Sequence, residues 1–294
     1  MTLSQTYTVF TPSIWSPRIN FWFSQNLVAA KFFDNYSDDV SGGGDTIYIP
    51  SLSQAFTVGD VAVTNGTVAA TNVSDTKSAL SLSTWSGSAF VLTDFQAAQA
   101  MKSYRIRENY MQKMAYDLAK SMDQAIIRVG AGITPSVGDS STALLATTIE
   151  KAFGILASYS VPKSECVLFV SPKTYWNRIM AISKYYDASQ FGRPSLPTGV
   201  QDLLYGVPVV ITELITTCTY AAESGSAAAG YRNFLIHKSA IVYALANLDG
   251  GGSGPRLQIK DNGDLAVKPT GDIAYGTLLL NAARGVKILD KVAA

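Results

Sequence analysis

Alternating hydrophobic and polar positions mark a long segment in the first third of the chain. Two runs between residues 46 and 63 alternate as β-strands do, and residues 79–92 resume the pattern as a returning strand. Between them, Asn65-Gly66 supplies the pair of positive φ angles that a tight hairpin turn requires. The pattern therefore predicts a long β ribbon over residues 46–92.

This predicted ribbon is almost without charge. Asp60, Asp75 and Lys77 are the only charged residues in it, and Ser, Thr, Val and Ala dominate the rest. A ribbon with so little apolar mass cannot form a core of its own, and its free edges would be sticky in water. We therefore expect it to lie on a neighbouring copy of the chain.

A helical period follows the ribbon. Apolar residues recur at three- and four-residue steps over 93–128, Thr93 and Gln96 form a capping box, and neither Gly nor Pro interrupts before Gly130. A helix of roughly 35 residues would be on the order of 50 Å long. Its charged residues of both signs are typical of one solvated face.

The remainder is an α/β region followed by a β region. A Gly-rich linker at 130–141 precedes alternating helices and strands over 142–248, and Ser171-Pro172 has the pattern of a helix N-cap with Pro at the first helical position. A second Gly-rich joint at 249–254 leads to residues 255–294. There the pattern predicts a hairpin at Asn262-Gly263 and a last long strand over 273–288, with breaks at Gly276 and Gly285.

Composition narrows the class of protein. Hydrophobic residues make up 47% of the 294 residues and charged residues only 15%, against roughly 25% in an average soluble domain. The net charge is +1, so we expect no sequence-specific nucleic-acid binding, which needs a strong basic excess. Near-neutrality also favours association of many copies. The sequence shows neither a secretory signal nor a membrane span.

Residues for nucleophilic or metal chemistry are few. Cys166 and Cys218 are the only cysteines and lack metal-ligand spacing, and His237 is the only histidine. His237 lies among apolar residues near an expected strand end, with no Ser or Cys motif beside it, so we interpret it as structural.

Other motifs give no catalytic site. Gly130-Ala131-Gly132 begins like a dinucleotide fingerprint but follows a helix and lacks the third glycine. Two Asp pairs, 38/39 and 261/264, occupy expected turns, where Asp is favoured for local hydrogen bonding. We therefore predict a protein that is not an enzyme, with no catalytic, metal-binding or cofactor-binding residue and no cofactor.

The order of these segments resembles the major capsid proteins of tailed bacteriophages, with the fold named for phage Hong Kong ninety-seven. The resemblance covers nearly the whole chain, and its carriers are stretches of sequence rather than single residues. These stretches are 14–18, 44–50, 111–128, 170–175 with 199–200, and 204–210.

The resemblance implies an α+β fold with five parts. They would be an N-terminal arm (1–45), an extended β-hairpin loop (46–92), a long spine helix (93–130), an α/β axial domain (142–248) and a peripheral-domain β-sheet (255–294). It also implies a structural subunit that self-assembles as pentamers and hexamers into an icosahedral shell around viral double-stranded DNA. The subunit would be made in the host cytoplasm and reside in the virion.

Partners and alternatives follow from the same resemblance. Further partners would be scaffolding, portal and decoration proteins and, without sequence specificity, the packaged DNA; no membrane is implied. Some relatives cross-link Lys to Asn between subunits, but Lys77 and Asn281 match no such motif, so we expect no cross-link here. Two alternatives stay open: an encapsulin-like nanocompartment shell, and an α/β enzyme that uses a carboxylate pair. The enzyme would form a small oligomer, whereas either shell would form megadalton particles.

Overall fold

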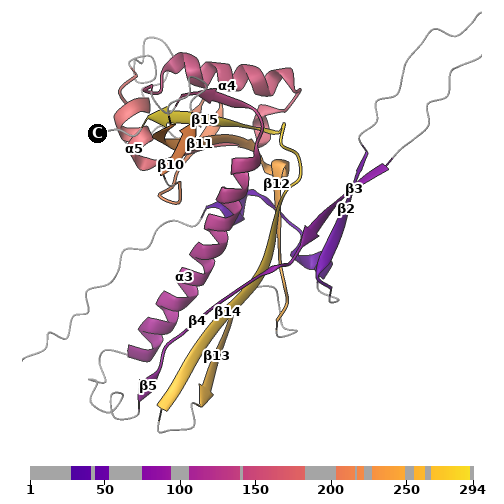
Figure 1. Ribbon diagram of the computed structural model, residues 1–294, viewed down its shortest axis with the longest axis vertical. Helices are drawn as coiled ribbons and strands as arrows, with labels where there is room; N and C mark the ends of the chain where they lie inside the picture. Colours follow the sequence, from indigo (N-terminus) through magenta and orange to yellow (C-terminus); the bar gives the residue numbers. More distant parts are fainter. Residues whose placement is uncertain are drawn as a thin grey trace, which may run out of the picture.

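The computed structural model describes residues 28–40, 44–52, 75–93, 106–139, 142–182, 203–215, 217–221, 227–248, 255–261 and 266–291. Within them, a seven-stranded sheet lies at one end of a long helix, a longer and narrower sheet runs beside that helix, and a two-stranded ribbon stands off to one side (Figure 1). The predicted α+β class is confirmed.

The ribbon consists of β2 (Thr46–Leu52) and β3 (Asp75–Ser81), which pair antiparallel. Its base is anchored, because Ile49 and Leu80 are buried in one cluster with Val40 and Val242. Strand pairing in this segment was predicted and is confirmed for these residues, whereas the predicted Asn65-Gly66 turn lies outside the described residues.

The long sheet is built on β14 (Ala266–Leu279). β12 (Ile241–Leu245) and β13 (Arg256–Asp261) pair antiparallel with successive parts of one edge. The pairing of β13 with β14 confirms the predicted hairpin, whereas its predicted Asn262-Gly263 turn lies outside the described residues. β4 (Thr84–Ala89) and β5 (Leu92–Thr93) pair with the other edge. The two-residue strand β1 (Asp34–Asn35), which precedes the 3-10 turn η1 (Ser37–Val40), lies parallel to β12.

The position of β4 and β5 corrects the predicted extent of the ribbon. The sequence pattern continues the ribbon to residue 92, but after the bond from Leu82 N–H to the Asp45 carbonyl (2.7 Å) the chain leaves β2 and joins β14. Period-two alternation identifies a strand without identifying its partner, so this change of partner had no signal in the pattern.

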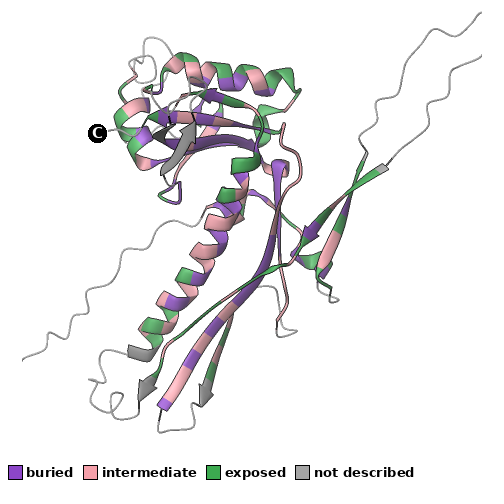
Figure 2. Ribbon diagram, in the orientation of Figure 1, coloured by how far each residue is buried: buried purple, intermediate pink, exposed green. Residues whose placement is uncertain are grey.

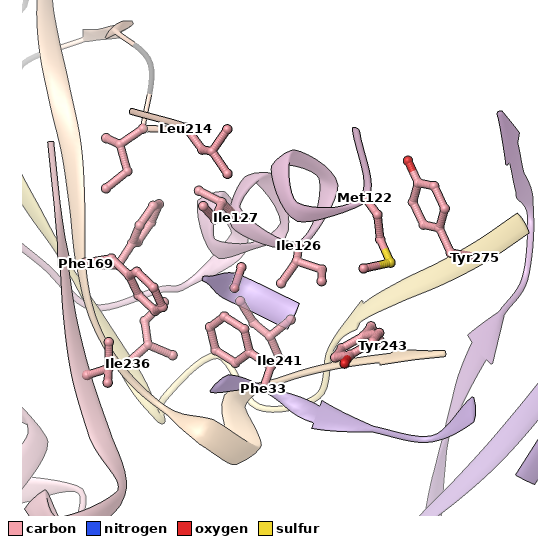
Figure 3. Close-up of a cluster of buried hydrophobic side chains, with 14 of the residues drawn as sticks. Phe33, Met122, Ile126, Ile127, Phe169, Leu214, Ile236, Ile241, Tyr243 and Tyr275 are labelled. Carbon is pink, nitrogen blue, oxygen red and sulfur yellow. The ribbon is translucent and has the colours of Figure 1, made fainter. Parts of the chain in front are cut away.

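Helix α3 (Ile106–Val129) confirms the predicted long helix from residue 106 onward. Residues 94–105, with Gln96 of the predicted capping box, lie outside the described residues, and Thr93 belongs to β5. The described part spans about 36 Å. Along one face Met114, Leu118, Met122 and Ile126 are buried at four-residue steps. They pack with Phe33, Tyr243 and Tyr275 among others (Figure 3).

The seven-stranded sheet forms the core of the α/β region, and the strands at its centre are largely buried (Figure 2). Its strands in spatial order are β6 (Ser136–Gly138), β15 (Gly285–Lys291), β11 (Ala227–His237), β7 (Cys166–Val170), β9 (Val207–Ile211) and β8 (Leu203–Leu204), with β10 (Thr217–Ala221) also on β11.

Helices cover this sheet and connect its strands. The helical segments are α4 (Ala146–Ser158), α5 (Pro172–Thr174) with the π-helical turn η5 (Tyr175–Ile179), and the 3-10 turns η3 (Gly130–Gly132), η4 (Lys163–Glu165) and η6 (Lys238–Ala240). The predicted N-cap is confirmed, because Ser171 Oγ accepts a hydrogen bond from Thr174 N–H at 3.1 Å.

Sheet membership crosses two boundaries expected from the sequence. β12 falls in the expected axial segment 142–248 but pairs in the long sheet, whereas β15 falls in the expected peripheral segment 255–294 but pairs in the seven-stranded sheet. The strand predicted over 273–288 is two strands in different sheets, because β14 ends at Leu279 and β15 begins at Gly285. Of its two predicted breaks, Gly285 marks the start of β15, whereas Gly276 lies inside β14. Each sheet thus contains one strand from the segment that was expected to form the other sheet.

Candidate assembly surfaces

The ribbon presents unpaired backbone and a nearly uncharged surface. In the described part of the chain, β2 and β3 pair only with each other, so their outer edges are open. Tyr48 is 59% exposed, and Lys77 Nζ lies 4.3 Å from the centre of its ring. An open edge of this kind is a ready site for pairing with another chain.

A second exposed surface lies on the long sheet. An open groove of about 360 Å³ is lined by residues of β4, β13 and β14. Trp85 lies at this groove with 72% of its surface exposed, and its indole Nε1–H donates to Asp272 Oδ2 at 3.0 Å. Arg256 binds the same carboxylate with both Nε and Nη2, at 2.9 and 2.5 Å. Trp and Arg side chains held in place beforehand are the residues that most often anchor protein interfaces.

Large exposed apolar side chains also occur in the α/β region, but they are dispersed. Leu145 and Tyr159 flank the two ends of α4, and Trp176 and Leu203 belong to η5 and β8; each is more than 50% exposed. Burial of their exposed apolar area against a partner would be favourable, at roughly 25 cal/mol per Å².

A buried carboxylate joins the N-terminal segment to the long helix. Asp123 of α3 is fully buried and accepts backbone N–H bonds from Val28 (2.8 Å), Ala29 (3.1 Å) and Ala30 (2.8 Å), at the start of α1 (Ala29–Phe32). Tyr243 Oη donates to the Ala30 carbonyl at 2.6 Å, and burial, followed by the charge of Asp123, raises the pKa of Tyr243. These bonds fix the position of residues 28–30 on α3.

Of the residues considered for nucleophilic or metal chemistry, the structure brings His237 and Cys166 close to each other. His237 ends β11, as expected for a residue near a strand end, and its side chain is 7% exposed. No Ser or Cys motif in the sequence points at His237, but the structure places one residue of each kind beside it. Ser239 Oγ lies 2.9 Å from His237 Nδ1, and Cys166 is its cross-strand neighbour. The Ser239 contact is local along the chain, whereas the Cys166 contact depends on a strand pairing that no motif encodes.

The contacts of His237, Ser239 and Cys166 are structural hydrogen bonds at turns. Ser239 N–H also donates to His237 Nδ1, so the imidazole caps the 3-10 turn η6. Cys166 donates its thiol to the Pro162 carbonyl at 3.2 Å, and burial, with a smaller effect of Glu165, raises the pKa of this thiol to about 11. A thiol that stays protonated at neutral pH is a poor nucleophile.

The remaining candidates from the sequence are separate from one another. Asp38 and Asp39 lie in the turn η1, and Asp261 ends β13 while Asp264 is outside the described residues. Gly130-Ala131-Gly132 forms η3 directly after α3. Lys77 is exposed on the ribbon, whereas Asn281 follows β14 and uses Oδ1 to accept from Ala283 N–H at 2.9 Å.

Two further tests apply to the described residues. They contain no group of three or more His, Cys, Asp or Glu side chains that could hold a metal ion. Among the helices described, none combines the length and apolar character needed to cross a membrane.

Comparison with known proteins identifies the fold. No family model and no curated protein matches the chain. Solved structures do match it over nearly its full length. A Mycobacterium phage Che8 structure has 18% identity and a TM-score of 0.77, covering 96% of this chain and 98% of that one. The capsid structure of cyanophage P-SCSP1u has 11% identity and a TM-score of 0.76, covering 97% and 94%. The capsid of cyanophage Pam1 has 13% identity and a TM-score of 0.71, covering 100% of each chain.

The chain therefore has the fold of phage capsid proteins. This is the fold that the order of its sequence segments resembles, and it is confirmed by the structural matches.

Proposed function

We propose that this chain is a major capsid protein, a structural subunit that assembles as pentamers and hexamers into an icosahedral shell around viral double-stranded DNA. The observation that carries the proposal is the match to phage capsid structures, which covers almost all of this chain and almost all of each neighbour. A fold alone does not determine function. Here, however, the surfaces of this chain also favour assembly.

The surfaces have the properties that a repeating shell needs. The ribbon projects from the body and leaves two open edges, while Trp85 and the Arg256–Asp272 pair present a fixed aromatic and polar site on the long sheet. Because these surfaces differ, contact between them would be heterologous, and heterologous contacts that close by rotation form rings. The near-zero net charge adds little repulsion between copies.

Each segment would then have the role of the corresponding segment in the major capsid proteins of tailed bacteriophages. The ribbon would be the extended loop, the seven-stranded sheet with α4 and α5 the axial domain, and α3 with the long sheet the peripheral domain. Scaffolding, portal and decoration proteins would be further partners. Contact with the packaged DNA would be independent of its sequence. The subunit would be made in the host cytoplasm and reside in the virion.

Electron microscopy of the purified full-length chain tests this proposal. We expect closed particles of megadalton size. Small discrete oligomers under all solution conditions would contradict it.

A ribbon-shortened variant provides the matched comparison. Leu52 and Asp75 are directly opposite each other, so residues 53–74 can be replaced by Asn-Gly, which closes a two-residue hairpin in the same register. The buried anchors Ile49 and Leu80 remain in place, so we expect a folded subunit that forms no stable shells. Normal particles from this variant would contradict the role of the ribbon.

A further inference from the structure

Besides the passage through α3, which leads from β5 to β6, the chain passes between its two large sheets twice, and both of these crossings lie at one elbow. On the first crossing β11 ends at His237, η6 turns, and β12 begins in the long sheet; on the second, residues 280–284 lead from β14 back to β15. The crossings bond to each other. His237 N–H donates to the Arg284 carbonyl at 3.0 Å, and Leu280 N–H donates to the Ala240 carbonyl at 2.9 Å. The elbow therefore helps to set the position of one sheet relative to the other.

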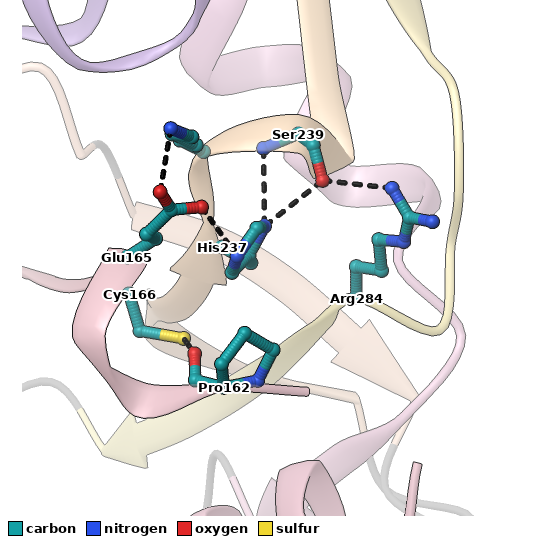
Figure 4. Close-up of polar contacts among 7 residues, drawn as sticks. Pro162, Glu165, Cys166, His237, Ser239 and Arg284 are labelled. Atoms are coloured by element: carbon teal, nitrogen blue, oxygen red, sulfur yellow. Dashed lines mark hydrogen bonds and ion pairs between the residues drawn. The ribbon is translucent and has the colours of Figure 1, made fainter. Parts of the chain in front are cut away.

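The imidazole of His237 lies at this elbow, bonds to Ser239 on the first crossing and is linked through the Ser239 hydroxyl to Arg284 on the second (Figure 4). Its Nδ1 accepts from Ser239 N–H at 3.2 Å and lies 2.9 Å from Ser239 Oγ. That hydroxyl accepts in turn from Arg284 Nη1 at 2.8 Å, on the second crossing. Because Nδ1 is an acceptor, the ring of this structure is neutral and carries its proton on Nε2.

The second ring nitrogen faces a carboxylate. His237 Nε2 lies 3.3 Å from Glu165 Oε2, without an aligned hydrogen-bond partner among the described residues. Glu165 Oε1 accepts from Lys238 Nζ at 2.7 Å. Nε2 is thus placed to form a full ion pair with Glu165 once the ring is charged.

Charged groups on every neighbouring element act on the ring. Burial lowers the pKa of His237 from its usual value near 6.5; Glu165 of η4 and Asp34 of β1 raise it, whereas Arg284 and Lys238 lower it. Cys166 of β7, across the strand pair, remains an uncharged thiol at neutral pH. The net effect lowers the pKa of His237, so the ring is neutral at neutral pH.

We propose that His237 is a proton-operated clasp of this elbow: the neutral ring caps η6 and thereby supports the Ser239–Arg284 bond between the crossings, and the protonated ring weakens both. A protonated Nδ1 can no longer accept from Ser239 N–H, so the cap of η6 is lost, and the ring can bond the Ser239 hydroxyl only as a donor. The clasp thereby couples pH to the relative placement of the sheet that carries Trp85 and the sheet that carries α4 and α5.

The sign of the effect follows from linkage. A base whose pKa is lowered in the closed form binds fewer protons there than in an open, solvated form. Above pH about 6.5 the closed elbow keeps its full stability, and that stability falls as the pH drops through 6.5 toward the lowered pKa. Acid therefore favours the open elbow.

Amide hydrogen exchange on the full-length chain tests the clasp, with intrinsic exchange rates corrected for pH. Peptides that cover residues 238–245 and 279–286 should lose about tenfold protection between pH about 7.5 and about 5. In His237→Asn the amide oxygen takes the place of Nδ1 and can still cap the turn without gaining a proton. This variant should retain its protection at the lower pH.

Glu165→Gln supplies a second arm. Without the carboxylate that stabilises the charged ring, the pKa of His237 in the closed elbow falls further below its value in the open elbow, so the loss of protection should begin at the same pH and become larger. An equal acid-induced loss in the wild-type chain and in His237→Asn would overturn the proposal, and so would the absence of any loss in the wild-type chain.

A direct titration keeps the proposal testable if His237→Asn does not fold. His237 is the only histidine, so carbon-13-labelled histidine gives one imidazole signal for the whole chain. We expect it to titrate below pH 6.5, together with the signal of the Ser239 amide. A pKa at or above 6.5 would mean that the histidine is purely structural and would overturn the clasp.

Discussion

Asp123 Oδ1 lies 2.8 Å from the backbone nitrogen of Ala30, which fastens the start of α1 to the middle of α3 across more than ninety residues of sequence. The other carboxylate oxygen takes the N–H groups of Val28 and Ala29. One buried charge is thus matched by three backbone donors at a helix N-terminus, where negative charge is stabilised. The relationship fixes the start of α1 on α3.

Replacement of this carboxylate should detach α1. Asp123→Ala leaves one buried and two part-buried N–H groups without their side-chain acceptor, and we expect a loss of about 3 kcal/mol in the free energy of unfolding, measured by urea titration. Asp117→Ala, on the same helix, removes an exposed carboxylate paired with Lys113 at 2.6 Å and should cost less than about 0.5 kcal/mol. Equal losses in the two variants would contradict the anchoring role of Asp123.

Gly276 and Gly154 should respond to alanine in opposite directions. A Cβ on Gly276 of β14 would lie 2.3 Å from the Ser81 carbonyl oxygen, a backbone atom that cannot move aside cheaply, so Gly276→Ala should lower the melting temperature and disturb the junction between β3 and β14. A Cβ on Gly154 of α4 would meet nothing within 4 Å, and Gly154→Ala should stabilise the helix by about 0.8 kcal/mol. Thermal unfolding of both variants measures the contrast. A fully stable Gly276→Ala would show that the approach of the two strands is looser than described.

Trp85 should matter for assembly and not for folding. Its side chain is 72% exposed in the isolated chain, so Trp85→Ser should change the free energy of unfolding by less than about 0.5 kcal/mol. If the groove is an interface, the same change should reduce the yield of particles strongly, as measured by sedimentation. Undiminished assembly of Trp85→Ser would remove this groove from the assembly surfaces.

Local signals in the sequence were the most informative about the fold. The N-cap at Ser171, the long helix that ends at Val129 and the strand pairing at the base of the ribbon all depend on contacts between residues close in sequence or on a sustained period. Such patterns encode an element directly. The order of the elements was enough to indicate a resemblance to capsid proteins, and the structural matches confirm that fold.

Partner choice between strands was not predictable in the same way. β12 and β11 are separated by a three-residue turn yet join different sheets, and β15 returns to β11 after a long excursion through the other sheet. Apolar strands that are buried on both faces look alike in sequence whichever sheet they enter. The elbow at His237 was missed for this reason, because Arg284 and Glu165 reach it only through that topology.

Sedimentation velocity of the purified full-length chain, over a wide range of concentrations, tests most directly whether copies of this chain assemble with one another into a shell. The account predicts megadalton particles at high concentration, and only subunits or small rings from the ribbon-shortened variant. A full-length chain that stays a stable monomer at the highest concentration would contradict it.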